Sequence, residues 1–252
     1  MRITERDRVV LAFAGEQKLV LADQVKALLG TSLEAAARRL RALRAEGFLD
    51  ADRPFAEQPA CHQVTREGLA LIESRLPTPR AVDRAHYRHD VGVGWLWLAA
   101  RAGVWGELSD VVSERAMRSR DGRAPGAERY GVRLGGLGPG GRERFHYPDL
   151  LLVDPNGHRV AVELELSGKG HRRLEGILGG YAADPRIDAA LYLVDKPSVG
   201  RNVQAAARAL GISDLVHVQR AQWGENAPAA GTARVRARRQ VRAASKGGVL
   251  ER

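Results

Sequence analysis

Apolar side chains recur at helical spacing near the start of the chain. Thr4 precedes the first such series and has Asp7 three residues further on, which is the spacing of a capping box. Residues 22–29 continue the pattern and predict a second helix that ends at Gly30. A third helix is expected at residues 33–46, with an apolar stripe formed by Leu33, Ala36, Ala37, Leu40 and Leu43.

Two short extended segments follow the third helix. Residues 48–50 and 61–64 predict strands, and the Pro-containing residues 53–59 between them predict a loop. A fourth helix is expected at residues 66–75. The order of three helices, a hairpin and a further helix predicts a winged helix-turn-helix over residues 1–76.

The pattern changes at the Pro-Thr-Pro of residues 77–79, which predicts a short stiff linker. After it, residues 80–102 predict a helix and residues 107–118 predict a strand. Residues 120–144 are rich in Gly, Pro and charge, and we expect a mobile loop there. This loop does not have the Gly-Lys-Ser/Thr ending of a phosphate-binding loop.

The second half of the chain alternates between strand and helix patterns. Residues 149–153 and 159–166 predict two strands, joined by a turn in which Asn156-Gly157 supplies the positive φ angles. The elements expected after them are a helix at 171–183, a strand at 189–194, a helix at 199–210 and a strand at 215–219. The fold class predicted is therefore α/β (α+β), with a mixed sheet flanked by helices over residues 80–223.

The charge balance adds an expectation about partners. The chain has 252 residues, and its formal net charge is +10, which favours polyanionic partners such as nucleic acid. Half of this excess lies after residue 224, where seven Lys and Arg residues face two Glu residues. We expect residues 224–252 to form a basic, disordered tail.

Cysteine use and hydropathy indicate the compartment. Cys61 is the only cysteine, so neither an intramolecular disulfide nor a cysteine-based metal site can form. Residues 1–15 carry five charges, which is not typical of a signal peptide. The most apolar stretch, residues 91–104, is too short to span a bilayer. We therefore expect a cytoplasmic protein that does not enter the membrane.

The third predicted helix has a basic face. Four arginines lie on it: Arg38, Arg39, Arg41 and Arg44. On a winged helix, such a face suits the phosphates and guanine edges of duplex DNA. Two alternatives stay open, because an arginine run can be a solvated face and a winged helix can dock a protein partner instead.

The predicted strand at residues 159–166 carries the candidate chemistry. Side chains alternate between the two faces of a strand, so Glu163 and Glu165 point the same way. Asp149 begins the partner strand, and Lys169 follows within one short loop. Converging carboxylates repel one another, and a hard divalent cation such as Mg²⁺ or Mn²⁺ removes that cost.

The same residues resemble the core of the PD-(D/E)xK nuclease superfamily. The resemblance is carried by Tyr147-Pro148-Asp149, by the Asn156-Gly157 turn and by the segment Val162-Glu163-Leu164-Glu165-Leu166-Ser167-Gly168-Lys169. It implies Mg²⁺-dependent (or Mn²⁺-dependent) hydrolysis of phosphodiesters, with Asp149 and Glu163 on the metal. We interpret Glu165 as a third metal ligand and place Lys169 near the scissile phosphate. The superfamily normally has Lys where this chain has Glu165, although some restriction endonucleases carry Glu there.

Residues 1–220 as a whole are similar to the replication-relaxation family of plasmids and integrative elements. Besides the hairpin block, the likeness is sharpest at His89-Asp90-Val91-Gly92-Val93. It implies a role in plasmid replication or DNA relaxation. We expect duplex DNA as a partner, and other replication or mobilisation proteins as further partners. A homodimer is a further expectation, since cutting both strands requires two active sites.

Three functions remain open at this stage. The first is a metal-dependent DNA endonuclease or nickase that also binds DNA through Arg172 and Arg173. The second is a non-catalytic DNA-binding accessory factor or regulator, in which Glu163 and Glu165 are solvated or paired with arginines such as Arg159. The third is a protein-interaction module. Fold-level likeness does not choose between them.

Several other residues are weaker candidates. His86 and His89 share a helix face at a spacing that can bind metal, but no third ligand is evident nearby. Asp90 or Glu107 could supply an extra acidic group to the metal site. Four tyrosines could act as nucleophiles in a covalent nicking mechanism, namely Tyr87, Tyr130, Tyr147 and Tyr181. The absence of a His-hydrophobe-His motif disfavours that mechanism.

Overall fold

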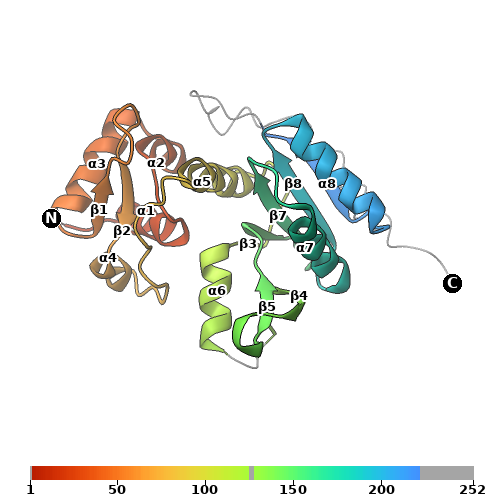
Figure 1. Ribbon diagram of the computed structural model, residues 1–252. Helices are drawn as coiled ribbons and strands as arrows, with labels where there is room; N and C mark the ends of the chain where they lie inside the picture. The colour runs from red at the N-terminus through yellow and green to blue at the C-terminus, as the bar shows by residue number, and fades with distance from the viewer. Residues whose placement is uncertain (1, 125–127, 222–252) are drawn as a thin grey trace. The chain divides into compact units, whose positions relative to one another are not determined.

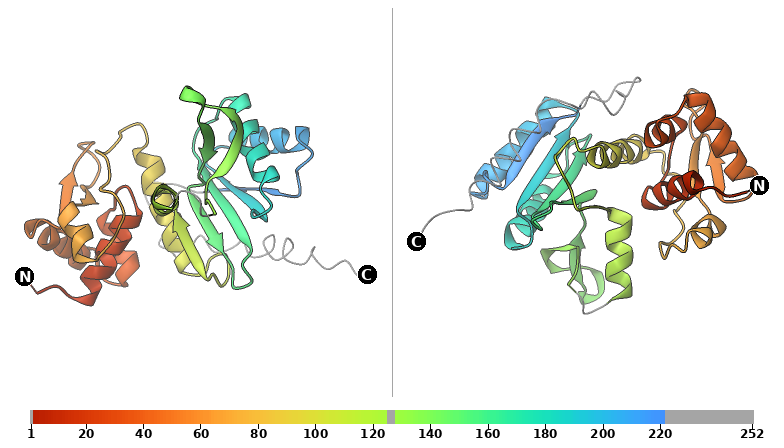
Figure 2. Two further views of the ribbon diagram at one scale, coloured as in Figure 1. Left: turned by 90° about the horizontal axis from the view of Figure 1, so that it is seen from below. Right: turned by 180° about the vertical axis from the view of Figure 1, so that it is seen from behind.

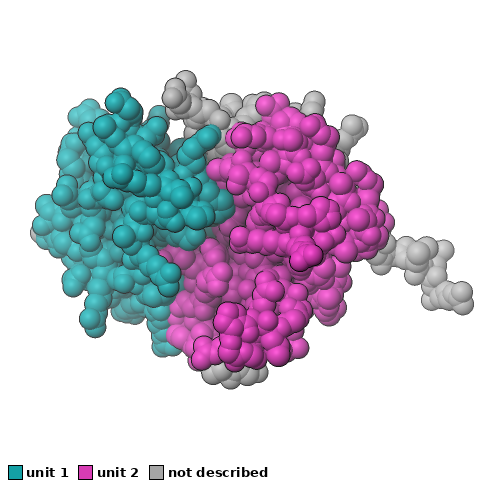
Figure 3. All heavy atoms as spheres, viewed as in Figure 1, with its two compact units in different colours: residues 1–98 teal, residues 99–252 magenta. Residues whose placement is uncertain are grey.

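The computed structural model describes residues 2–124 and 128–221, and the predicted basic tail at 224–252 lies outside the described residues. The chain divides into two compact units, Met1–Leu98 and Ala99–Arg252 (Figure 3). The boundary at Leu98 falls later than the predicted linker at residues 77–79. Among the described residues, no helix has both the length and the apolar character needed to cross a membrane.

Three helices open the first unit, each begun or ended by a local signal. Helix α1 (Glu5–Glu16) starts at Thr4, whose side chain forms the predicted capping box with Asp7. Helix α2 (Ala22–Leu29) ends at Gly30, which has a φ of 60°. Helix α3 (Leu33–Ala45) is capped by the Ser32 side chain, which accepts a hydrogen bond from the backbone N–H of Ala35.

A hairpin and a short helix complete the predicted order of elements. Strands β1 (Leu49–Asp52) and β2 (Cys61–Val64) pair antiparallel, and helix α4 (Arg66–Leu71) follows, ending before the predicted residue 75. Helix α5 (Tyr87–Arg101) also begins later than the predicted residue 80. Its residues as far as Leu98 belong to the first unit, which explains the late boundary.

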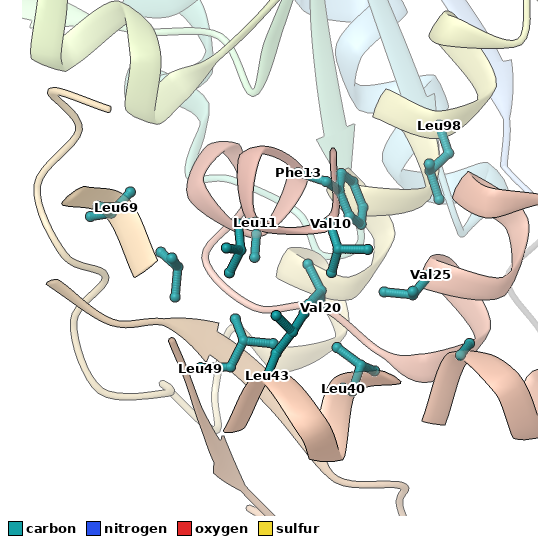
Figure 4. Close-up of a cluster of buried hydrophobic side chains, with 13 residues drawn as sticks. Val10, Leu11, Phe13, Val20, Val25, Leu40, Leu43, Leu49, Leu69 and Leu98 are labelled. Atoms are coloured by element: carbon teal, nitrogen blue, oxygen red, sulfur yellow. The ribbon is translucent and has the colours of Figure 1, made fainter. Parts of the chain in front are cut away.

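One cluster of buried side chains holds the first unit together (Figure 4). Its members from α3 are Ala36, Leu40 and Leu43, all of which the stripe predicted. Leu33 departs from the prediction, because 46% of it is exposed at the first position of the helix. The cluster also contains Val10, Leu11, Phe13, Ala14, Val20, Val25, Leu49, Val64, Leu69 and Leu98.

A five-stranded mixed sheet forms the centre of the second unit. The strand order is β3–β6–β7–β8–β9. The strands are β3 (Asp110–Ser113), β6 (Leu150–Val153), β7 (Arg159–Glu165), β8 (Ala189–Val194) and β9 (Val216–Arg220). Pairing is antiparallel from β3 to β7 and parallel from β7 to β9, so the described chain is a mixed α+β protein.

Helices α7 (His171–Ala183) and α8 (Pro197–Ala209) cover one face of this sheet (Figure 1). Tyr181 of α7 reaches Glu163 on β7, and Gly200 of α8 lies against Val218 on β9. In the register of the sheet, Glu163 of β7 lies opposite Tyr192 of β8, and Tyr192 lies opposite Val218 of β9. All three side chains therefore belong to the covered face.

Two predictions between residues 107 and 144 were wrong. The predicted strand 107–118 is β3 followed at once by helix α6 (Glu114–Arg123), because the Ser113 side chain caps a helix there. The predicted loop 120–144 contains a hairpin of β4 (Val132–Leu137) and β5 (Glu143–His146), with a 3₁₀ turn, η1 (Pro139–Gly141), at its tip (Figure 2). Positive φ angles at Gly140 and Gly141 make this tight return possible.

Gly180 lets α7 approach the β4–β5 hairpin closely. A Cβ atom at this position would lie 2.8 Å from the carbonyl oxygen of Arg133 on β4. We expect Gly180→Ala to lower the free energy of unfolding by about 1–3 kcal/mol, because backbone must move to relieve the overlap. Urea denaturation followed by circular dichroism measures this change.

The preceding glycine on the same helix is the matched control. A Cβ atom at Gly179 would meet nothing within 4 Å. Gly179→Ala should therefore raise stability by about 0.5–1 kcal/mol through the higher helix propensity of alanine. Equal effects of the two substitutions would contradict the close packing of α7 on β4.

Candidate functional site

The site lies where β6 begins and β7 ends. Leu150 of β6 pairs with Val162 of β7, which places Asp149, just before β6, beside the carboxyl end of β7. The Asp149 carboxylate accepts a hydrogen bond of 2.8 Å from the backbone N–H of Leu164. The sheet therefore brings Asp149 and the carboxylates of β7 to one place, as the hairpin pattern predicted.

Glu163 is the most enclosed of these carboxylates, with only 2% of the residue exposed. Its Oε1 atom lies 2.5 Å from Nε2 of His146 and accepts a hydrogen bond from the Tyr181 hydroxyl. Its Oε2 atom lies 3.7 Å from Nζ of Lys169. Burial alone would raise the pKa of Glu163, but His146, Lys169 and Tyr181 together hold that pKa well below its ordinary value.

Glu165 and Lys169 form an ion pair beside Glu163. Burial raises the pKa of Glu165, and the charge of Lys169 opposes that rise without cancelling it. Burial works against the charge of Lys169, but Glu163 and Glu165 outweigh it and raise the Lys169 pKa above its ordinary value. One ammonium group thus balances two neighbouring carboxylates.

Lys169 reaches the cluster from the short loop between β7 and α7. Gly168 and Gly170 flank it, and neither glycine has other atoms within 4 Å of a would-be Cβ position. The Lys169 ammonium group pairs with Glu165, the residue at the position where the superfamily normally has Lys.

His146 was missed as a site residue in the sequence analysis, and Tyr181 was considered only as a nucleophile. His146 fell just after the predicted loop, although it is the last residue of β5 and precedes Tyr147-Pro148-Asp149 directly. Tyr181 faces the buried side of α7, and its hydroxyl is committed to Glu163. The two rings meet edge to face at a centroid distance of 5.8 Å, so each helps to position the other.

Tyr192 adds a second buried hydroxyl to this region. Its backbone lies opposite that of Glu163 in the pairing of β7 with β8. Its hydroxyl has no hydrogen-bond partner among the described residues. Burial raises the pKa of Tyr192 well above its ordinary value, and the charges of Glu163, Glu165 and Asp149 add to that rise. The phenol therefore stays neutral next to the carboxylates.

The donor types suit a hard divalent cation, but their arrangement does not. Within residues 2–124 and 128–221, no group of three or more His, Cys, Asp or Glu side chains is placed so that it could hold a metal ion. Glu163 already accepts from His146 and Tyr181, and Lys169 stands between Glu163 and Glu165. As arranged, the cluster fits an ammonium group, and the predicted Mg²⁺ or Mn²⁺ site stays a prediction.

The four arginines of α3 do not share one environment. Arg38 lies 3.7 Å from Glu34 on the outer side of the helix, with 67% of its side chain exposed. Arg41 and Arg44 are also exposed. Arg39 instead makes two hydrogen bonds to the fully buried carboxylate of Asp7 on α1. Its guanidinium therefore links two helices, which leaves three of the four predicted arginines for a partner.

The remaining candidates are exposed, buried or paired with neighbouring side chains. Arg172 and Arg173 are exposed in the first turn of α7, within three or four residues of Lys169 in the chain. His86 pairs with Asp83, while Asp90 lies 3.3 Å from both His89 and Lys18. Glu107 is exposed. Of the four candidate tyrosines, Tyr87 and Tyr181 are buried, Tyr130 hydrogen-bonds to Arg120, and Tyr147 lies under Arg118.

Comparison with known proteins adds little. No protein-family model matches the chain, and no curated protein matches it. Among solved structures, the chain is similar to "PigF with SAH", with 15% sequence identity, a TM-score of 0.20 and 86% of this chain covered. The chain spans 62% of the length of that protein. A likeness this weak says nothing about the ligand or the activity of the present chain.

Proposed function

We propose that this chain is a DNA-binding protein whose second unit hydrolyses a phosphodiester bond, as an endonuclease or nickase. The observation that supports the proposal most is the position of Lys169. Its ammonium group pairs with Glu165 and lies 3.7 Å from Glu163, with Asp149 held at the same end of β7. Fixed positive charge of this kind stabilises the charge that develops on a phosphate during hydrolysis.

The proposed reaction assigns separate roles to these groups. Water attacks phosphorus and gives up a proton, the bond from phosphorus to the leaving sugar oxygen breaks, and that oxygen takes up a proton, so that the products are a terminal phosphate and a free hydroxyl. Lys169 would contact a non-bridging phosphate oxygen. Glu165, whose pKa is raised, is better suited to exchange a proton than Glu163, whose pKa is lowered. Glu163 would hold His146 and Lys169 in place.

DNA binding belongs in this proposal to the first unit and to exposed arginines near the site. Arg38, Arg41 and Arg44 lie outside the buried stripe of α3, which is the third helix of a helix–helix–helix–hairpin–helix arrangement. A winged helix uses that helix to contact duplex DNA. Replication or mobilisation of a plasmid in the cytoplasm is the proposed setting, on the strength of the resemblance alone.

A second candidate function has one observation in its favour. Glu163 is almost fully buried, and hydrogen bonds and an ion pair occupy its oxygens. A carboxylate bound in this way can serve as the centre of a structural network. The chain would then be a non-catalytic DNA-binding accessory factor or regulator, and the cluster would hold β5, β7 and α7 together.

Two measurements on the purified protein test the proposal. The first is the affinity for a 30-base-pair duplex at several salt concentrations, with Arg38→Gln/Arg41→Gln/Arg44→Gln as the variant. The proposal predicts a steep salt dependence. In the triple variant, the slope of log K against log[salt] should be shallower by about 2.7. The second is nicking of supercoiled plasmid with Mg²⁺, with Mn²⁺ and with chelator, since the resemblance predicts these cofactors.

The outcomes separate the candidates. Salt-sensitive binding together with metal-dependent nicking supports the nuclease. Salt-sensitive binding without nicking under any of the three conditions supports the accessory factor. Binding that does not respond to salt, or an α3 triple variant that binds as the wild type does, contradicts the role of α3 in DNA binding and favours a protein-interaction module.

A further inference from the structure

The α6 helix and the β4–β5 hairpin together form a strongly basic part of the second unit. We call them the α6–hairpin surface, and they comprise residues 114–124 and 128–146. The arginines of this surface are Arg115, Arg118, Arg120, Arg123, Arg129, Arg133, Arg142 and Arg144. Only four acidic residues accompany these eight arginines. Among those four, Asp121 is buried and accepts hydrogen bonds from the backbone of Tyr130 and Gly131.

Aromatic rings hold several of these guanidinium groups in place. Arg118 lies over the ring of Tyr147 at 4.4 Å, and Arg129 lies over Phe145 at 4.7 Å. Arg120 lies over Tyr130 at 5.4 Å and also donates a hydrogen bond to its hydroxyl. Stacking fixes the plane of a guanidinium. Arg118 also donates a hydrogen bond of 2.8 Å from Nε to Glu114, and Arg120 lies 3.9 Å from Asp110, so an acceptor would use their remaining N–H groups. Such groups lose little entropy when they bind a phosphate.

The tip of the hairpin carries further positive charge. Arg142 and Arg144 are exposed on the β5 side of the tip. The aliphatic part of Arg144 packs beside Gly138, where a Cβ atom would come within 3.1 Å of its Cγ atom. The stem of this arginine is therefore anchored while its charged end remains in solvent. Glu143, which lies between the two arginines in the chain, is paired with Arg133 at 3.4 Å.

The hairpin leads directly to the carboxylate cluster. On β5, Arg144 and His146 point to the same face, about 7 Å apart along the strand. His146 in turn contacts Glu163. Each strand of duplex DNA presents a phosphate roughly every 3.4 Å of rise. A DNA strand that binds Arg144 through one phosphate would thus place the phosphate about two nucleotides further along near His146.

We propose that the α6–hairpin surface binds the phosphate backbone of duplex DNA and guides it to the carboxylate cluster. This inference rests on the proposed function, because DNA is the partner assumed there. It extends that function by adding a contact surface outside α3 and outside Arg172 and Arg173. The positive charge, the anchored guanidinium groups and the short path to His146 all match a polyphosphate chain.

The test uses the full chain with Arg142→Gln/Arg144→Gln, and Arg201→Gln/Arg208→Gln as the control. The control residues are exposed on α8, so both double variants lose the same charge. Fluorescence anisotropy measures the affinity for a labelled 30-base-pair duplex over a range of salt concentrations. The hairpin variant should bind roughly 60-fold more weakly near 0.1 M salt, with a slope of log K against log[salt] reduced by about 1.8. The control variant should match the wild type.

The result that would overturn the inference differs from the one that would overturn the proposed function. If the wild type binds DNA through α3 but the hairpin variant matches the control, only the role of the hairpin is excluded. If the wild type shows no salt-sensitive binding to the duplex, DNA binding itself is excluded. A single-stranded RNA of equal length that binds more tightly, and that alone responds to the hairpin substitutions, would assign the surface to a different partner and overturn the inference.

Discussion

Replacing Glu163 by glutamine is expected to slow the nicking of supercoiled plasmid by at least about 100-fold. The substitution keeps the size of the side chain and removes its charge. That charge interacts with three groups at once, namely His146, Tyr181 and Lys169. Loss of one preorganised electrostatic contact in an active site commonly costs about 10²–10³ in rate. Glu163 is proposed to hold two groups in place, His146 and Lys169. The loss in rate should therefore be no smaller than the lower limit of this range.

The matched control is Glu175→Gln. Glu175 lies on α7 and pairs with His171 at 3.1 Å, away from the hydrogen bonds that surround Glu163. Initial rates of nicked-circle formation with Mg²⁺ and with Mn²⁺ measure the effect, and circular dichroism shows whether each variant is folded. Wild-type rates from a folded Glu163→Gln protein would exclude the cluster as the catalytic site, even if the wild type cuts DNA.

Lys169 and Glu163 should act as one unit in this assay. A variant that lacks both residues should be about as slow as the slower single variant, because either substitution already disrupts the same arrangement. Multiplication of the two single effects would instead indicate that Lys169 and Glu163 contribute independently. The ion-pair geometry favours the first result.

The regular elements near the site were predictable because their signals are local. The bounds predicted for α7 and β8 are those of the structure, His171–Ala183 and Ala189–Val194. In α7 the apolar positions recur at helical spacing, and β8 is a short apolar run flanked by polar residues. Of the two turn residues Asn156 and Gly157, for which positive φ angles were predicted, only Gly157 has one, at 86°. The antiparallel pairing of β6 with β7 nevertheless follows the predicted hairpin, and it brings Asp149 close to Glu163.

The parts that sequence reasoning missed depend on contacts between distant residues. The β4–β5 hairpin has many glycines and charges, and it is ordered by packing against α7 at Gly180. His146 and Tyr181 are 17 and 18 residues from Glu163 in the chain, so no spacing rule connects them. Arg39 looked like its neighbours on α3, and only the fold places the buried carboxylate of Asp7 beside it.

The balance of charge in the cluster leads to the last prediction. Lys169→Met should lower the free energy of unfolding by about 3 kcal/mol at pH 8, because removing one partner of a buried ion pair leaves the other charge uncompensated. In this protein two charges would be left, those of Glu163 and Glu165. The raised pKa of Lys169 means that the wild-type ammonium is charged throughout the neutral range. Lys196→Met, an exposed lysine before α8, should change stability by no more than about 0.5 kcal/mol.

The pH dependence shows whether charge is the cause. The lowered pKa of Glu163 contributes stability that is present above its unfolded-state pKa of about 4.3 and is lost as the pH falls through its folded-state pKa. In the Lys169→Met variant both carboxylates should protonate at higher pH, which removes their repulsion. The difference in stability between wild type and variant, from urea denaturation at pH 8 and pH 4, should therefore shrink towards the acid end. A difference that stays constant would mean that Lys169 stabilises the loop by packing and that some other cation balances Glu163 and Glu165.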